Sequence, residues 1–98
     1  MEIQREQNGG ELDITLSGRL DTATAPRLEA ELKRSLDGVE RLVLDLGALE
    51  YMSSAGLRVL LAAQKVMNRQ GEMIVRRVNE TIMEVFEVTG FVDILTIE

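Results

Sequence analysis

The sequence predicts a single α/β domain with a mixed, mostly parallel sheet. An Asn-Gly-Gly turn near the N-terminus separates two strand-like segments, which predicts an antiparallel hairpin. After this hairpin, strand-like and helix-like segments alternate, as they do when helices connect parallel strands. The 98 residues suit one domain, and 45% hydrophobic with 29% charged residues is typical of a folded protein.

The hairpin occupies the first part of the chain. Ile3 begins a weak strand, and the turn is predicted at residues 8–10 because Asn-Gly favours the positive φ of tight hairpins. In the return strand, residues 12–17, leucine and isoleucine alternate with polar residues, which predicts one buried face.

Three helices follow at intervals. The first is predicted over residues 24–36, where leucines recur every four residues. The second is predicted over residues 54–69, where apolar side chains cover most of the circumference, and Gly71 ends it. The third is predicted to begin after Asn79, a good N-cap residue, and to end at Gly90.

Three strands alternate with these helices, so the predicted order is β-β-α-β-α-β-α-β. Residues 41–46 are more continuously apolar than the preceding strand, which predicts a central strand covered on both faces. Further strands are predicted at residues 72–76 and 92–97. Residues 18–21 are expected to leave the strand before them, and residues 51–54 to form a loop.

The composition excludes several classes of function. The chain has no cysteine and no histidine, so it holds no disulfide, no thiol nucleophile, no Ser-His-Asp triad and no thiolate or imidazole metal site. Neither lysine follows a glycine, as a phosphate-binding P-loop requires. The net charge of −6 argues against nucleic acid as a partner. Without a long apolar run or a signal-like N-terminus, we expect a cytoplasmic protein, with no membrane contact, no cofactor, no metal and a monomeric free state.

Ser53 and Ser54 lie where a strand-end loop enters the second helix. A helix N-terminus offers unpaired N–H groups and partial positive charge, which would stabilise a phosphate on a serine there. Gly56 would let another backbone approach closely. The alternative is that one serine only caps the helix.

The segment Gly18-Arg19-Leu20-Asp21-Thr22 also lies between a strand and a helix. If neighbouring strands carry both loops, Asp21 and Ser54 lie on the same edge of the sheet. The alternative is that Asp21 or Thr22 only caps the first helix.

A basic stripe is predicted on the second helix. Arg58, Lys65 and Arg69 recur at spacings that put them on one helix face. In an acidic protein this stripe would dock an acidic patch of a partner, or it would be an ordinary solvated face.

Taken together, the motifs resemble the STAS domain family, and within it the stand-alone bacterial anti-sigma factor antagonists. The resemblance covers almost the whole chain and makes residues 1–98 one STAS domain. It rests on the order and spacing of five segments, which are Gly18-Arg19-Leu20-Asp21, Leu44-Asp45-Leu46, residues 51–57 (YMSSAGL), Gly71-Glu72-Met73 and residues 86–91 (FEVTGF).

The resemblance implies a phosphorylation switch. The unphosphorylated antagonist binds an anti-sigma factor that is also a serine kinase and thereby frees a sigma factor. Phosphorylation releases the kinase, and a serine phosphatase restores the antagonist. The implied acceptor is Ser54, directly before Ala55-Gly56. The family often has aspartate where Ser53 stands, which leaves two adjacent hydroxyls.

The resemblance also implies a partner-binding surface. Asp21 matches the aspartate of the family's Gly-x-Leu-Asp loop, which is implicated in partner binding. The expected contact residues are Asp21, Thr22, Ser53, Ser54, Ala55, Gly56 and Arg58.

Two other functions compete with this one. Some single STAS-like proteins are constitutive subunits that bind the ATPase of a lipid-transporting ABC system. An enzyme would need a base beside a Ser54 nucleophile, but Lys65 lies about 16 Å away along the helix. We therefore predict a binding protein and not an enzyme.

Overall fold

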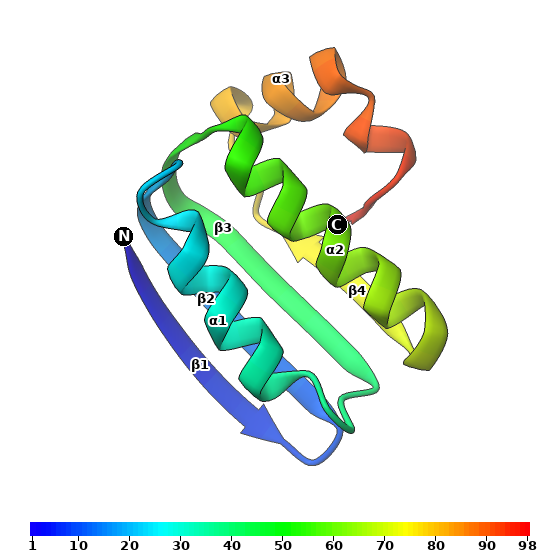
Figure 1. Cartoon of the computed structure of the whole chain (residues 1–98). Coiled ribbons are helices and arrows are strands. Elements are labelled where there is room, and N and C mark those ends of the chain that lie inside the picture. The colour runs from blue at the N-terminus through cyan, green and yellow to red at the C-terminus, as the bar shows by residue number, and fades with distance from the viewer.

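A five-stranded mixed sheet forms the frame of the computed structural model, which describes residues 1–98 (Figure 1). The first strand runs antiparallel to the second, and all later neighbours are parallel. The strands stand side by side in chain order, as β1 (Glu2–Asn8), β2 (Glu11–Leu20), β3 (Arg41–Met52), β4 (Glu72–Arg76) and β5 (Thr96–Ile97). The predicted hairpin, strand and helix order and mixed sheet are confirmed.

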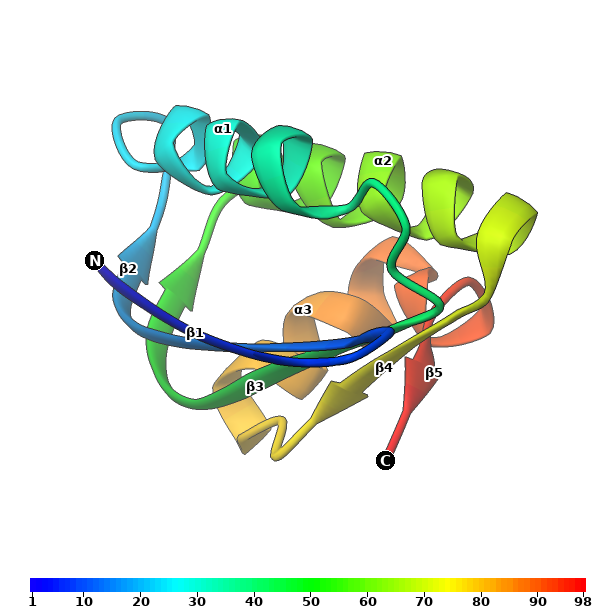
Figure 2. The ribbon, with the colours of Figure 1, turned by 90° about the horizontal axis from the view of Figure 1, so that it is seen from below.

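Two helices, α1 (Ala25–Ser35) and α2 (Ser54–Gln70), lie side by side on one face of the sheet (Figures 1 and 2). The third helix, α3 (Glu80–Thr89), packs against β3 and against the 3-10 turn that follows it. Its ends follow the predicted local chemistry. The Asn79 side chain accepts a hydrogen bond from the Ile82 N–H at 3.0 Å, and Gly90 takes the left-handed conformation with φ of 79°.

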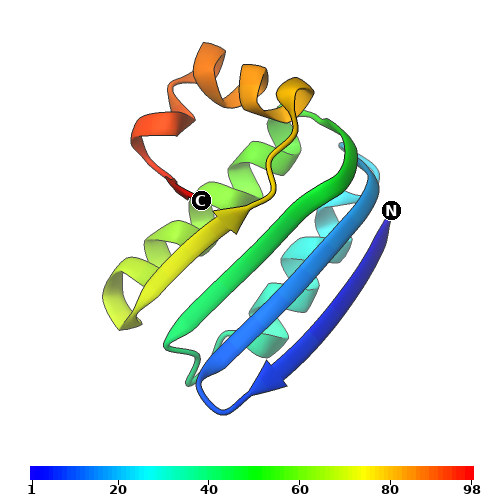
Figure 3. The same cartoon turned by 180° about the vertical axis from the view of Figure 1, so that it is seen from behind.

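The other face of the sheet carries no helix (Figure 3), so the prediction that residues 41–46 are covered on both faces is wrong. The strand order never reverses, and crossovers of one hand then put their helices on the same face. Val43 is buried on the open face because its neighbours on the adjacent strands are Asp13 and Ile74. The continuous apolar run therefore reflects a central position in the sheet.

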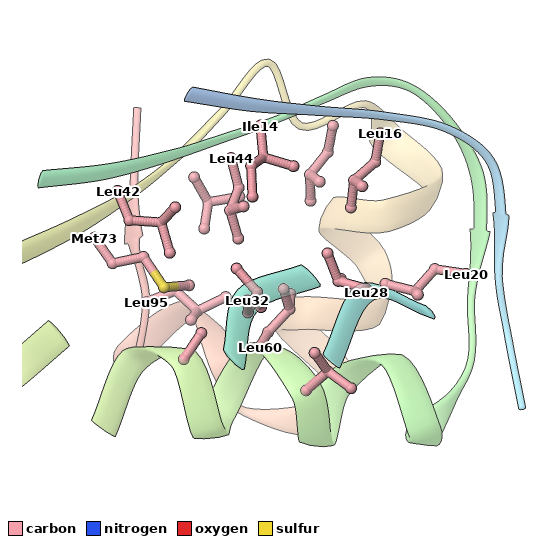
Figure 4. Packing of buried hydrophobic residues seen from close by; sticks show 14 of the residues in the cluster. Ile14, Leu16, Leu20, Leu28, Leu32, Leu42, Leu44, Leu60, Met73 and Leu95 are labelled. Carbon is pink, nitrogen blue, oxygen red and sulfur yellow. The ribbon is translucent and has the colours of Figure 1, made fainter. Parts of the chain in front are cut away.

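The hydrophobic core fills the space between the sheet and the helices (Figure 4). Ile14 and Leu16 of β2 point into it, and Leu12 of the same strand is also part of the buried cluster, as the period of two predicts. Leu28 and Leu32 of α1 meet them from the helix layer. Burying each large aliphatic side chain contributes about 1.5–3 kcal/mol, so this cluster dominates the stability of the fold.

Strands β2 and β3 run further than their sequence patterns predict. Gly18 and Leu20 remain in β2, and Tyr51 and Met52 remain in β3. Register shifts in the β2–β3 pairing carry it around a bend, which interrupts the alternation that marks a strand. The bent ends curve toward the N-termini of α1 and α2 (Figure 2).

The predicted last strand, residues 92–97, is shorter than expected. Residues Phe91–Asp93 form a 3-10 turn, and only Thr96–Ile97 pair with β4. Phe91 stacks on the buried Phe86 with ring centroids 6.5 Å apart. That contact stabilises the turn in a segment whose composition suits a strand.

Candidate partner-binding site

Two loops meet at the carboxyl edge of the sheet. In the parallel register Leu20 at the end of β2 is opposite Met52 at the end of β3. The Ser53 N–H donates to the Leu20 carbonyl oxygen at 2.9 Å, which joins the two chain segments directly. The Asp21 loop and the Ser53–Ser54 segment therefore lie side by side, as parallel topology predicts for neighbouring strands.

The Asp21 carboxylate organises its own loop. Its Oδ1 accepts the backbone N–H groups of Ala23 and Thr24, both at 3.0 Å. The Thr24 hydroxyl donates to the Arg19 carbonyl at 2.8 Å and closes the loop from the other side. Neither Asp21 nor Thr22 is the N-cap of α1, which is Thr24. Asp21 thus shapes the turn that leads into the helix, with its side chain still 30% exposed.

These hydrogen bonds predict how stability depends on pH. The Thr24 N–H, followed by the other donors and the Arg19 charge, lowers the pKa of Asp21 below its ordinary 3.8. A lowered native pKa adds stability that is complete above the ordinary value and is lost as the pH falls through the native value. The stability difference between wild type and Asp21→Asn in urea should therefore shrink as the pH falls below about 4. A difference that stays constant with pH, or grows on acidification, would contradict this account.

Ser53 and Ser54 have different environments at the start of α2. Ser53 is the N-cap residue, but its side chain makes no capping hydrogen bond, and its Oγ is buried with no partner. Ser54 is the first helical residue, and it is exposed. The interpretation that a serine side chain caps α2 is therefore wrong for this structure. Ser54 is therefore exposed to solvent, whereas the Ser53 hydroxyl is buried.

Gly56 needs a correction as an expected contact residue. It is buried, and a Cβ atom there would lie 2.7 Å from Leu20 Cγ and 3.1 Å from Met52 Cγ. Glycine at this position lets α2 pack against the ends of β2 and β3. Its close approach is to its own domain, so Gly56 positions the site without forming part of its surface.

Arg19 and Tyr51 form a pair that the sequence analysis did not predict. The guanidinium carbon of Arg19 lies 4.3 Å from the centre of the Tyr51 ring, a cation–π contact. Arg19 Nε also lies 3.7 Å from the Asp21 Oδ2. Both residues precede the last buried residue of their strand, and the register pairs them. This shared position, one residue before the end of each strand, is the feature of the sequence from which the pair could have been predicted.

Thr22, Ala55 and Arg58 line one hollow between the N-terminal ends of α1 and α2. Thr22 and Arg58 are exposed, and Ala55 is half-buried. Of the expected contact residues, the structure therefore leaves Asp21, Thr22, Ser54, Ala55 and Arg58 at least partly exposed at this edge, whereas Gly56 and the Ser53 hydroxyl are buried. No group of three or more carboxylates is placed to hold a metal ion.

Comparison with known proteins assigns the family. The family model described as the STAS domain matches residues 2–98. The chain belongs to the STAS domain family. No helix in the structure has the length and apolar composition needed to cross a membrane.

Named relatives of this STAS domain protein are regulators. It is 42% identical over 99 residues to a Bordetella bronchiseptica protein provisionally named anti-sigma factor antagonist BtrV, covering 99% of this chain and 85% of that one. It is 32% identical over 97 residues to the anti-sigma-B factor antagonist of Listeria monocytogenes, covering 96% and 84% of the two chains.

Solved structures agree on the fold. The crystal structure of an anti-sigma factor antagonist from Mycobacterium paratuberculosis superposes with a TM-score of 0.88 at 26% identity, covering 98% of this chain and 83% of that one. The unphosphorylated form of SpoIIAA gives 0.78 at 19% identity, covering 99% and 87%. At that identity the second match supports the shared fold alone.

Proposed function

We propose that this STAS domain protein is an anti-sigma factor antagonist that is switched by phosphorylation of Ser54. Its unphosphorylated form would bind an anti-sigma serine kinase and free a sigma factor, and a serine phosphatase would reset it. The protein would act in the cytoplasm as a binding regulator and not as an enzyme. The similarity to named antagonists supports this function.

One observation carries the assignment of the acceptor. Ser54 is exposed at the first position of α2 and is free of capping hydrogen bonds, whereas the neighbouring Ser53 Oγ is buried. A kinase has to reach the hydroxyl oxygen with its nucleotide, so exposure favours Ser54. The first N–H groups of α2 then lie near the phosphate and stabilise its charge.

The proposed switch needs no change of fold. Phosphorylation adds about −1.5 to −2 charges at pH 7. Asp21 lies on the same edge and is ionised at neutral pH, since its pKa is lowered from an ordinary value of 3.8. A phosphate there adds negative charge and a cost of desolvation to the interface, and like charges brought together in an interface cost several kcal/mol. The partner is therefore released by electrostatics at the contact itself.

Mapping the modified residue tests the acceptor. We expect incubation with the partner kinase and ATP to add one phosphate to wild type and to Ser53→Ala, and none to Ser54→Ala, when intact proteins are weighed by mass spectrometry. Ser53→Ala is a matched control because its hydroxyl has no hydrogen-bond partner to lose. Full phosphorylation of Ser54→Ala would overturn the assignment.

A further inference from the structure

A groove runs between α1 and α2 on the outer surface of the helix layer. Its apolar part is lined by Leu32 of α1, by Leu36 at the C-cap of that helix, and by Val59, Ala62 and Val66 of α2. The Gln70 Nε2 closes one end by donating to the carbonyl oxygens of Leu36 and Val39, both at 2.6 Å. The other end leads to the hollow lined by Thr22, Ala55 and Arg58. The groove is therefore continuous with the proposed site.

The charges on α2 are one-sided. Between Ser54 and Gln70 the helix has three basic residues and no acidic one, although the whole chain has 17 acidic and 11 basic residues. Seven of the eleven basic side chains form ion pairs, but Arg58, Lys65 and Arg69 form none. An acidic protein thus leaves unpaired cations together on one helix.

These cations lie along one rim of the groove. At 3.6 residues per turn, Arg58, Lys65 and Arg69 fall within an arc of about 40° around the helix axis. Ala62, which lines the groove, occupies the next angular position beside this arc. All three are exposed. On the opposite rim, Glu29 and Lys33 of α1 neutralise each other at 4.0 Å. Asp37, which follows α1, also lines the groove and is unpaired, so the uncompensated positive charge lies on the α2 rim alone.

We propose that this groove receives an amphipathic helix of the partner, with its apolar face in the groove and acidic side chains toward the α2 rim. The inference rests on the proposed function, because this helix would belong to the anti-sigma factor that contacts Ser54. The distance along α2 from Ala55 to Val66 is about 17 Å, which accommodates about three helical turns. Apolar anchors at helical spacing and complementary charge are the features of helix-in-groove recognition.

Photo-crosslinking within the complex tests the occupant. The photoreactive residue p-benzoylphenylalanine is placed in the full chain at Val66 in the groove, at Thr22 beside Ser54, or at Gln4 on the open sheet face. The probe is the anti-sigma factor of the same organism, purified after capture by the wild-type chain. We expect Val66 and Thr22 to crosslink to it and Gln4 not to. Digestion should map the Val66 product to a helical segment with acidic residues beside its apolar ones.

The outcomes separate the two proposals. Crosslinking from Thr22 without Val66 overturns the groove inference and leaves the proposed function standing. Absence of both products counts against the proposed function as well. A Val66 product on a segment that is basic or not helical overturns the stated occupant.

A charge comparison tests the rim independently. Lys65→Gln with Arg69→Gln lowers the net charge by two, and Gln4→Glu with Gln7→Glu does the same on the edge strand β1. We expect the first variant to lose about tenfold in affinity and most of the salt dependence of association, because rim charges act on encounter. The second should stay within about twofold of wild type. Equal effects of the two variants would show that only net charge matters and would contradict a basic rim contact.

Discussion

Replacing Ser54 by aspartate is expected to weaken binding of the anti-sigma factor by about 100-fold or more. The substitution puts a fixed negative charge on the exposed first residue of α2, on the edge that also holds the ionised Asp21. Like charges brought together in an interface cost several kcal/mol, and each 1.4 kcal/mol is a factor of ten in affinity. Aspartate has less charge than a phosphate, so this loss is a lower bound on the effect of phosphorylation.

The controls for this prediction separate charge from shape. Ser54→Ala removes the hydroxyl without adding charge and should bind within a few-fold of wild type in isothermal titration calorimetry. Ser54→Asp should keep the circular dichroism spectrum and the melting temperature of wild type to within a few degrees, because the residue is exposed and acidic residues suit a helix N-terminus. Equal affinity of the Asp and Ala variants would contradict the charge mechanism.

Replacing Gly71 by alanine is expected to cost about 3 kcal/mol of unfolding free energy, the upper end of what overpacking costs. A Cβ atom at Gly71 would overlap the Glu40 carbonyl oxygen. The neighbouring Glu72 N–H donates to that same oxygen at 3.0 Å, so the two segments cannot separate without loss of the bond. Chemical denaturation should show a lower midpoint with an unchanged slope.

Gly38→Ala is the matched control for this clash. Gly38 has a φ of 79°, but a Cβ atom there would meet nothing within 4 Å. Only the left-handed conformation is strained, which costs about 1–2 kcal/mol. If Gly71→Ala lost no more unfolding free energy than Gly38→Ala, the prediction that Gly71 is required by its close contact with Glu40 would be wrong.

Local chemistry made most of the fold predictable. The Asn-Gly turn, the leucine repeat of α1, the Asn79 cap and the Gly90 terminus each act through their immediate neighbours. The ends of β2 and β3 were not predictable, because register shifts between paired strands are a property of the pair. The 3-10 turn at Phe91 depends on a contact with Phe86, which local strand propensity does not reveal.

The candidate site was predictable to the extent that topology determines it. Parallel neighbours bring Asp21 and Ser54 to one edge whatever the details of packing. The different environments of Ser53 and Ser54 depend on how α2 sits against the sheet, and so does the burial of Gly56. The basic stripe follows from helical periodicity, but the groove beside it exists only because α1 and α2 pack next to each other.

A paired pull-down from the native cell lysate tests the central claim most directly. Wild type and Ser54→Asp serve as baits, and mass spectrometry identifies what each retains. We expect wild type to retrieve an anti-sigma factor with a serine-kinase ATPase domain and Ser54→Asp not to retrieve it. Equal retrieval of one partner by both baits, such as the ATPase of an ABC transporter, would contradict the switch and make this chain a constitutive binding subunit.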